Sequence, residues 1–335
     1  MFKFTRSRKS RSAALAGVLM IALLASACGN SNNGSASSPA PAESPPPATA
    51  ASAEPQSAGK TVTDAMGHEV KIPANPQKVL ASYLEDYLVT LGVTPVAQWS
   101  VPNGVQDYLS DKLSGVPTIS YDLPLEAVIS FAPDLILIGS ESAVQNGLYD
   151  QYSKVAPTYV LGDETGKDWR KALTTIGGLL GRSGQAEAAI AEYDRKAADA
   201  KAKLAKAVSG QSAAVVWLVQ KNFYLVDETQ SSGSVLYRDL GLTPPNLVTD
   251  IPEANRASWN PVTLEKLAEL KADHLFLVNS DKTEGSDVLN SAIWKGIPAV
   301  KAGHVYELEA SSSWLYNGPT AGSQVIDDVL KFLVK

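Results

Sequence analysis

The segment LEKLAELKADHLFLV at residues 264–278 repeats the pattern of LEAVISFAPDLILIG at residues 125–139. In both copies a Leu-Glu pair opens a short amphipathic segment, and an Asp eight residues after the Glu precedes an apolar run. A helical turn that leads into a strand buried on both faces has this pattern. The repeat therefore predicts two similar α/β lobes. The corresponding residues are Glu126 with Glu265 and Asp134 with Asp273.

Alternating strand and helix patterns surround both copies of the repeat. The first lobe is predicted to begin with a hairpin at 61–73 and to contain strands at 78–82, 95–99 and 158–162 and a helix at 83–92. The second lobe is predicted to contain a hairpin (213–220 and 222–227), a helix at 234–241, a strand at 304–308 and a closing helix at 319–335. Repeated strand–helix units of this kind favour mainly parallel sheets.

A long helix is predicted between the lobes. Residues 185–208 contain no Gly or Pro, and apolar side chains recur on one face at Ile190, Tyr193, Ala197 and Leu204. At 1.5 Å per residue this helix would be roughly 36 Å long. The predicted fold class is therefore α/β, with two doubly wound lobes joined by a single long interdomain helix. Such a helix predicts only a small hinge closure between the lobes.

The N-terminal residues have the features of an export signal. Five basic residues between Lys3 and Arg11 precede an apolar segment at 13–27 that is too short to span a bilayer. Cys28, the only cysteine, follows directly in LLASAC. This resembles the lipobox of bacterial lipoproteins, although Ala25 occupies the position where Leu is usual. The alternative is an ordinary secretory signal with a chance cysteine.

The predicted domain organisation follows from these segments. Residues 29–59 are rich in Ser, Ala and Pro without large apolar side chains, so they are predicted to be a disordered tether. The predicted boundaries are a lipoprotein signal peptide at 1–27, the lipidated Cys and tether at 28–59, an N-terminal lobe at 60–167, a helical linker at 168–209 and a C-terminal lobe at 210–335.

The charge balance argues against a nucleic-acid partner. The formal net charge of the 335-residue chain is −6. Removal of residues 1–27 takes away five basic and no acidic residues, so 24 basic and 35 acidic residues remain and the charge becomes −11. An acidic surface repels polyphosphates.

The sequence contains no recognisable catalytic motif. The three histidines, His68, His274 and His304, lack the spacing of a metal site, so no direct metal ligand is predicted. The segment GSES at 139–142 lacks the second Gly of a nucleophile elbow. The chain is therefore predicted not to be an enzyme. A lipid-anchored hydrolase that uses Ser140 is the remote alternative.

Aromatic residues at predicted loop positions are candidates for ligand contacts, because several of them fall beyond the carboxyl ends of strands, where ligands bind in doubly wound sheets. Packing at the sheet edge is the alternative for each of them. Arg256, close to one of these aromatics, is the clearest candidate cation. The aromatic candidates are Trp99, Tyr121, Trp259, Trp314 and Tyr316.

The whole folded part, about 60–335, resembles the substrate-binding lipoproteins of iron-siderophore and cobalamin ABC importers, the class III binding proteins. The segments that carry the resemblance are VLASYLEDYLVTLGV, PLEAVISFAPDLILIG, FYLVDETQSSGSVLYRDLGL and TLEKLAELKADHLFLV. In that family each lobe carries a surface glutamate that pairs with arginines of the permease. The resemblance assigns this role to Glu126 and Glu265, which the repeat also relates. Stabilisation of a helix N-terminus is an alternative role for both.

The resemblance also implies a cargo and its contacts. Cleft residues of the family correspond here to Tyr121, Ser140, Glu141, Gln220 and Arg256 with Trp259. Because Arg256 is the only clear cation among them, a less charged ferric siderophore of hydroxamate or mixed carboxylate type is favoured. The iron would be bound by siderophore oxygens, so no cofactor is expected. Cobalamin, haem or ferric citrate are alternative cargoes. The implied protein is a monomer, lipid-anchored on the extracytoplasmic face of the cell membrane, that delivers cargo to an ABC permease.

Overall fold

The computed structural model describes residues 59–335, except 103, 254–255, 282–286 and 335. The predicted signal peptide, Cys28 and almost the whole tether lie outside the described residues. No helix within the described part is long and apolar enough to cross a membrane. The lobe boundaries given above remain predictions.

The N-terminal part is built around a three-stranded parallel sheet in the order β3 (Val79–Leu80), β7 (Leu135–Ile138), β8 (Thr158–Val160). A second sheet has the order β5-β4-β6, and β1 pairs antiparallel with β2. The other elements of this part are β1 (Lys60–Thr63), β2 (Glu69–Ile72), α1 (Glu85–Thr90), β4 (Gln98–Val101), β5 (Gly104–Val105), α2 (Ser110–Leu113), β6 (Thr118–Ser120), α3 (Leu125–Phe131), α4 (Leu148–Tyr152) and α5 (Asp163–Gly166).

The C-terminal part is built on one five-stranded sheet in the order β11-β10-β9-β12-β13. β12 pairs in parallel with β9 and β13, whereas β10 pairs antiparallel with β9 and β11. The elements are β9 (Ala213–Val219), β10 (Asn222–Val226), α8 (Ser231–Ser234), a π-helical turn (Val235–Asp239), α9 (Asn246–Thr249), β11 (Trp259–Val262), α10 (Leu264–Leu267), β12 (His274–Asn279), α11 (Asp287–Asn290), α12 (Ala292–Gly296), α13 (Pro298–Lys301) and β13 (Val305–Glu309).

Both copies of the repeat form the predicted helix and buried strand. The first copy is α3 followed by β7, and the second is α10 followed by β12. All side chains of both strands are buried, and alternate residues of each strand belong to different apolar clusters on the two faces of the sheet. This is the burial pattern of a strand covered on both sides.

The repeated aspartates make equivalent contacts in the two sheets. The Asp134 carboxylate accepts hydrogen bonds from the backbone N–H groups of Gln77 (2.7 Å) and Lys78 (2.9 Å), directly before β3. The Asp273 carboxylate accepts bonds from the backbone N–H and the hydroxyl of Ser212, both at 2.7 Å, directly before β9. Each aspartate therefore holds the backbone at the start of the neighbouring parallel strand: Asp134, before β7, holds the start of β3, and Asp273, before β12, holds the start of β9.

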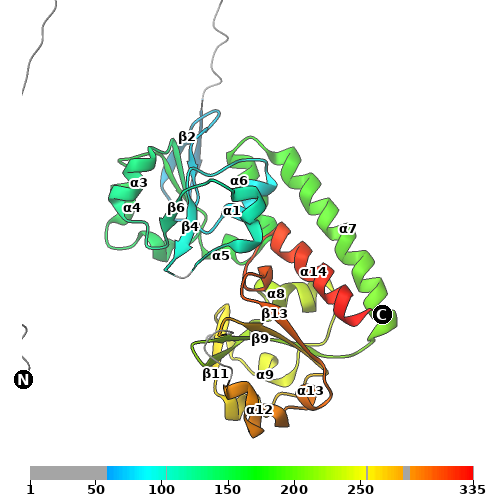
Figure 1. Cartoon of the computed structure of the whole chain (residues 1–335). Helices are drawn as coiled ribbons and strands as arrows, with labels where there is room; N and C mark the ends of the chain where they lie inside the picture. The colour runs from blue at the N-terminus through cyan, green and yellow to red at the C-terminus, as the bar shows by residue number, and fades with distance from the viewer. Residues whose placement is uncertain (1–58, 103, 254–255, 282–286, 335) are drawn as a thin grey trace, which may run out of the picture. The chain divides into compact units, whose positions relative to one another are not determined.

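Three helices connect the two parts. α6 (Trp169–Leu179) leads into α7 (Ser183–Ala207), and Figure 1 shows α14 (Pro319–Leu333) running beside α7. Lys196 on α7 forms an ion pair with Asp327 on α14 at 2.6 Å. One apolar cluster includes residues of these helices and of strands in both sheets. The predicted long helix is therefore packed into a core that both parts share.

A buried carboxylate links α1 to the start of α14. Asp86 accepts hydrogen bonds from the backbone N–H groups of Thr320 (3.0 Å) and Ala321 (2.9 Å) and from the hydroxyl of Tyr108 (3.2 Å). Gly318, which precedes α14, has a φ of 141°, and a Cβ at this position would lie 2.5 Å from the carboxylate. Only glycine permits this close approach without a shift.

Candidate functional site

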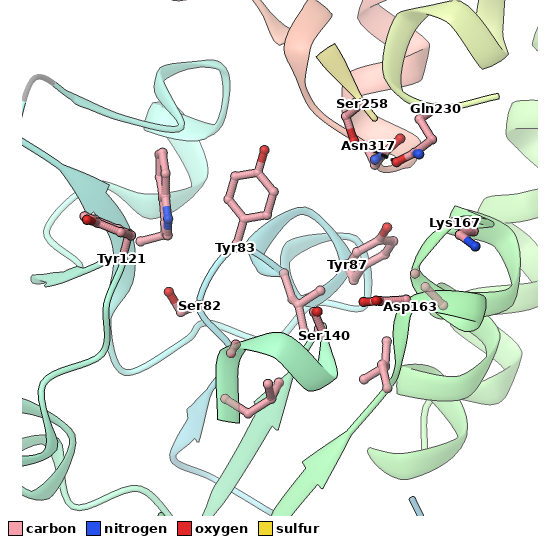
Figure 2. A pocket seen from close by; sticks show the side chains of 18 of the residues that line it. Ser82, Tyr83, Tyr87, Tyr121, Ser140, Asp163, Lys167, Gln230, Ser258 and Asn317 are labelled. Carbon is pink, nitrogen blue, oxygen red and sulfur yellow. Dashed lines mark hydrogen bonds between the residues drawn. The ribbon is translucent and has the colours of Figure 1, made fainter. Parts of the chain in front are cut away.

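A cavity of about 510 Å³ is lined by residues that follow the carboxyl ends of four N-terminal strands. Tyr83 follows β3, Tyr121 follows β6, Ser140 follows β7 and Asp163 follows β8. The carboxyl ends of parallel strands are the usual position for ligands in doubly wound sheets. Gln230, Ser258 and Asn317 line the cavity from the C-terminal part (Figure 2).

Aromatic side chains form much of the cavity wall. Tyr83, Tyr87, Trp99 and Tyr121 line it, and the Tyr121 side chain is 60% exposed. The rings of Tyr83 and Trp99 are 5.1 Å apart between centroids. Tyr83 has a φ of 66°, a backbone conformation that is unfavourable for a bulky residue and that typically costs about 1–3 kcal/mol. This strained backbone places an aromatic ring at the cavity.

The buried carboxyl group of Glu85 contacts the backbone of Trp99, one of these aromatic residues. Oε1 of Glu85 accepts a hydrogen bond of 2.6 Å from the backbone N–H of Trp99, whereas Oε2 has no hydrogen-bond partner. The side chain is fully buried, and this burial raises the pKa of Glu85 to about 7. The group therefore changes charge near neutral pH, directly beside a cavity-lining residue.

Among the described lining residues, only Asp163, at the start of α5, and Lys167, directly after α5, are acidic or basic. Nζ of Lys167 lies 2.6 Å from Oε1 of Glu164, so its charge is paired. The backbone N–H of Asp163 donates a hydrogen bond of 2.8 Å to Oε2 of Glu141, which holds the loop after β8. The cavity therefore combines aromatic faces and hydroxyl groups with little net charge.

The C-terminal part contributes polar groups to the cavity. The hydroxyl of Ser258 donates a hydrogen bond of 2.8 Å to Oε1 of Gln230. Oδ1 of Asn317 accepts a bond of 2.7 Å from the backbone N–H of Ser231. These bonds fix the acceptor atoms of both amide side chains, and their amide N–H groups donate to no other residue that the structure describes.

Three of the predicted ligand residues, Trp99, Tyr121 and Ser140, line the cavity. Two more predicted ligand residues, Glu141 and Tyr316, do not line the cavity but contact residues that do. Glu141 contacts the backbone of Asp163, as described above, and the ring of Tyr316 lies 6.0 Å from that of Tyr83.

The other predicted ligand residues make internal contacts. The Arg256 guanidinium forms an ion pair with Glu228. The Trp259 ring packs against that of Trp217 at 5.2 Å. The backbone N–H of Gln220 donates a hydrogen bond of 2.6 Å to Asp281 in the turn between β9 and β10. None of the three predicted residues lines the cavity.

The prediction for Trp314 requires correction. This residue was expected to contact a ligand, but its side chain is 0% exposed. Its ring packs 4.6 Å from that of Phe276, and its indole N–H donates a hydrogen bond of 2.9 Å to Asp328 on α14. Trp314 is therefore a core residue. The alternative stated for each aromatic candidate, packing within the protein, is the correct one for Trp314.

Both predicted docking glutamates are exposed. Glu126 and Glu265 lie in the first turns of α3 and α10, the helices of the repeat. Within the described part of the chain, neither side chain makes a hydrogen bond or an ion pair. Their surroundings are therefore compatible with contact to a partner.

Several lining residues were not predicted from the sequence. Tyr83 lies three residues after the end of β3, where the rule for strand carboxyl ends would have selected it, but the sequence pattern assigned it to the helix that follows. Tyr87 is on α1 and has the spacing of a core residue. Lys167, Gln230, Ser258 and Asn317 reach the cavity through tertiary packing and lack a local signal.

The histidines make ordinary structural contacts. His68 stacks on Tyr149 at 3.7 Å, and Nε2 of His274 lies 2.6 Å from Oε1 of Gln211. The described residues contain no group of three or more His, Cys, Asp or Glu side chains placed to hold a metal ion.

The fold and the position of the cavity define a substrate-binding protein of the two-part α/β type. Residues 81–311 match the family described as periplasmic binding protein, and the chain belongs to this family of extracytoplasmic substrate-binding proteins.

Several proteins are similar to this chain over most of its length. The iron(3+)-hydroxamate-binding protein FhuD of Bacillus subtilis is 31% identical over 91% of this chain and 92% of the relative. A FhuD-fold component of a ferrichrome ABC transporter from the same organism is 27% identical, with a TM-score of 0.69 over 82% of this chain and 100% of that structure. Staphylococcus aureus SirA, solved with staphyloferrin B, is 26% identical, with a TM-score of 0.69 over 82% and 98% of the two chains.

Proposed function

We propose that this protein captures a ferric siderophore, preferably of the hydroxamate type, and delivers it to an ABC permease for iron uptake. The observation that carries this proposal is a cavity with aromatic walls at the carboxyl ends of the N-terminal strands, in a chain that is 31% identical to a ferric-hydroxamate-binding protein. Aromatic faces and hydroxyl groups suit the apolar backbone and the carbonyl oxygens of such a complex.

The charge of the cavity favours hydroxamates over catecholates. A ferric tris-catecholate carries three negative charges and requires several cations around it. The described lining supplies only Lys167, which is paired with Glu164. A ferric tris-hydroxamate centre is neutral, so it needs no such cations. Burial of an uncompensated trianion would be strongly unfavourable.

Tryptophan fluorescence tests this choice, because Trp99 lines the cavity. The chain without residues 1–27 is titrated with a ferric hydroxamate, ferric staphyloferrin B, ferric citrate, haem and cobalamin. We expect saturable quenching by the hydroxamate with Kd below about 1 µM. Tight binding of cobalamin without a response to ferric hydroxamates would contradict the proposal.

We also propose that Glu126 and Glu265 dock the loaded protein onto the permease. The repeat places both at the start of corresponding helices, and both side chains are exposed. Exposed carboxylates suit reversible pairing with arginines, which sets register and association rate.

Charge reversal separates docking from cargo capture. The double variant Glu126→Arg, Glu265→Arg is expected to lose at least about tenfold in iron uptake by cells, because it would oppose partner arginines, while its cargo affinity stays unchanged. Glu187→Arg, at an exposed position of α7, is the matched control and should transport normally. Normal uptake by the double variant would rule out docking through these residues.

The anchoring proposal concerns Cys28, in the lipobox-like segment. Acylation there would hold a monomeric, non-catalytic protein at the extracytoplasmic face of the membrane. Cys28→Ser is expected to release the protein from the membrane fraction. Retention of this variant in the membrane fraction would contradict lipid anchoring.

A further inference from the structure

One carboxylate at the cavity has no cation bound to it. Asp163 lines the cavity and is exposed, and within the described residues its carboxylate makes no hydrogen bond or ion pair. Figure 2 shows it on the same side of the cavity as Tyr87 and Ser140. Lys167, the only described cation of the lining, is paired with Glu164 at 2.6 Å. Asp163 also attracts the Lys167 ammonium electrostatically, but more weakly than Glu164 does, so the Asp163 carboxylate keeps its hydrogen-bonding positions open.

The remaining surroundings also favour a positive group. Tyr83, Tyr87, Trp99 and Tyr121 present aromatic rings, whose faces attract cations. Arg256, the cation expected from the sequence, is held by Glu228 outside the lining. The chain without residues 1–27 carries a formal charge of −11, which attracts cationic ligands and repels anionic ones.

We propose that Asp163 forms a subsite that binds a terminal alkylammonium group of the siderophore. This inference rests on the proposed function and specifies its substrate class as a ferric tris-hydroxamate with a free primary amine. Three hydroxamates neutralise the iron, and an alkyl amine with a pKa near about 10 remains protonated at neutral pH. The complex therefore carries one positive charge, which a charge-assisted hydrogen bond to Asp163 would recognise.

The test compares two ligands that differ only at this amine. Ferrioxamine B, a linear ferric tris-hydroxamate that ends in a primary amine, and its N-acetylated derivative are titrated by calorimetry into the chain without residues 1–27. We expect the amine form to bind roughly tenfold more tightly, a modest factor because Asp163 is exposed. Asp163→Asn should remove this difference and leave the affinity for the acetylated form unchanged.

Asp122→Asn is the matched control, because Asp122 is also exposed, also follows a strand of the same part (β6) and does not line the cavity. It should keep the tenfold preference. Equal binding of both ligands to the unsubstituted protein would overturn the subsite and leave the proposed function standing. Binding of neither ligand would overturn both. Loss of the preference in Asp122→Asn as well would indicate a long-range charge effect and would overturn the contact.

Discussion

At the scale of single residues, Glu85 contributes a destabilising charge beside the site. Its pKa rises from 4.5 to about 7 on burial, so between these pH values the folded protein binds a proton that the unfolded chain has released. The free energy of unfolding should therefore decrease as the pH rises through this range, by up to about 3 kcal/mol, with no further change from this group above it.

The variant Glu85→Gln tests this linkage, because the amide oxygen can still accept the Trp99 N–H but cannot ionise. Urea unfolding at about pH 5 and about pH 8 should show a smaller loss of stability with pH than in the unsubstituted protein. Glu126→Gln, at an exposed position, should leave the loss unchanged. A Glu85→Gln variant with an unchanged pH slope would contradict a raised pKa at this position.

Trp99 was predicted because it ends a strand pattern, whereas Tyr121, in the loop before the repeat, and Ser140 were implied by the resemblance to siderophore-binding proteins; all three line the cavity. The position after a strand also selected Trp314, which is in the core. Position along the chain gives the end of a strand, but the direction of a side chain depends on the elements packed above it. This is also why Asn317 and Gln230, which reach the cavity from the C-terminal part, had no sequence signal.

At the scale of helices and strands, the start of α14 depends on Asp86 in α1. Asp86→Ala would leave the N–H groups of Thr320 and Ala321 without their buried acceptor, so we expect a loss of about 2–4 kcal/mol in the free energy of unfolding. Asp327→Ala, on the same helix, removes only a solvent-exposed ion pair and should cost less than about 1 kcal/mol. Equal losses in urea unfolding would show that Asp86 does not cap α14.

The elements were well predicted where periodicity was strong. The helix expected at 185–208 is α7 at Ser183–Ala207, and the hairpin expected at 213–227 is β9 with β10. The helix expected at 234–241 is instead a π-helical turn at Val235–Asp239, preceded by the short α8. Helical periodicity alone does not distinguish these hydrogen-bonding patterns, because tertiary packing selects between them.

At the scale of the whole molecule, the shared core limits domain motion. α7 and α14 belong to an apolar cluster that also contains strand residues of both sheets, so a large hinge rotation would expose packed side chains. We expect the radius of gyration from small-angle X-ray scattering to change by less than about 1 Å when a ferric hydroxamate binds. A decrease of several ångströms would indicate a flexible hinge and would contradict this role of the helices.

The central claim is that the cargo occupies the cavity beside Ser140 and Tyr87, and filling this cavity tests it most directly. Ala143 lines the cavity and is exposed, whereas Ala188, also exposed, lies on α7 outside the lining. Calorimetric titration with a ferric hydroxamate should show one-to-one binding to the unsubstituted protein and to Ala188→Trp. Ala143→Trp should lose at least about 100-fold in affinity while it remains folded. Unchanged affinity in a folded Ala143→Trp variant would contradict the claim.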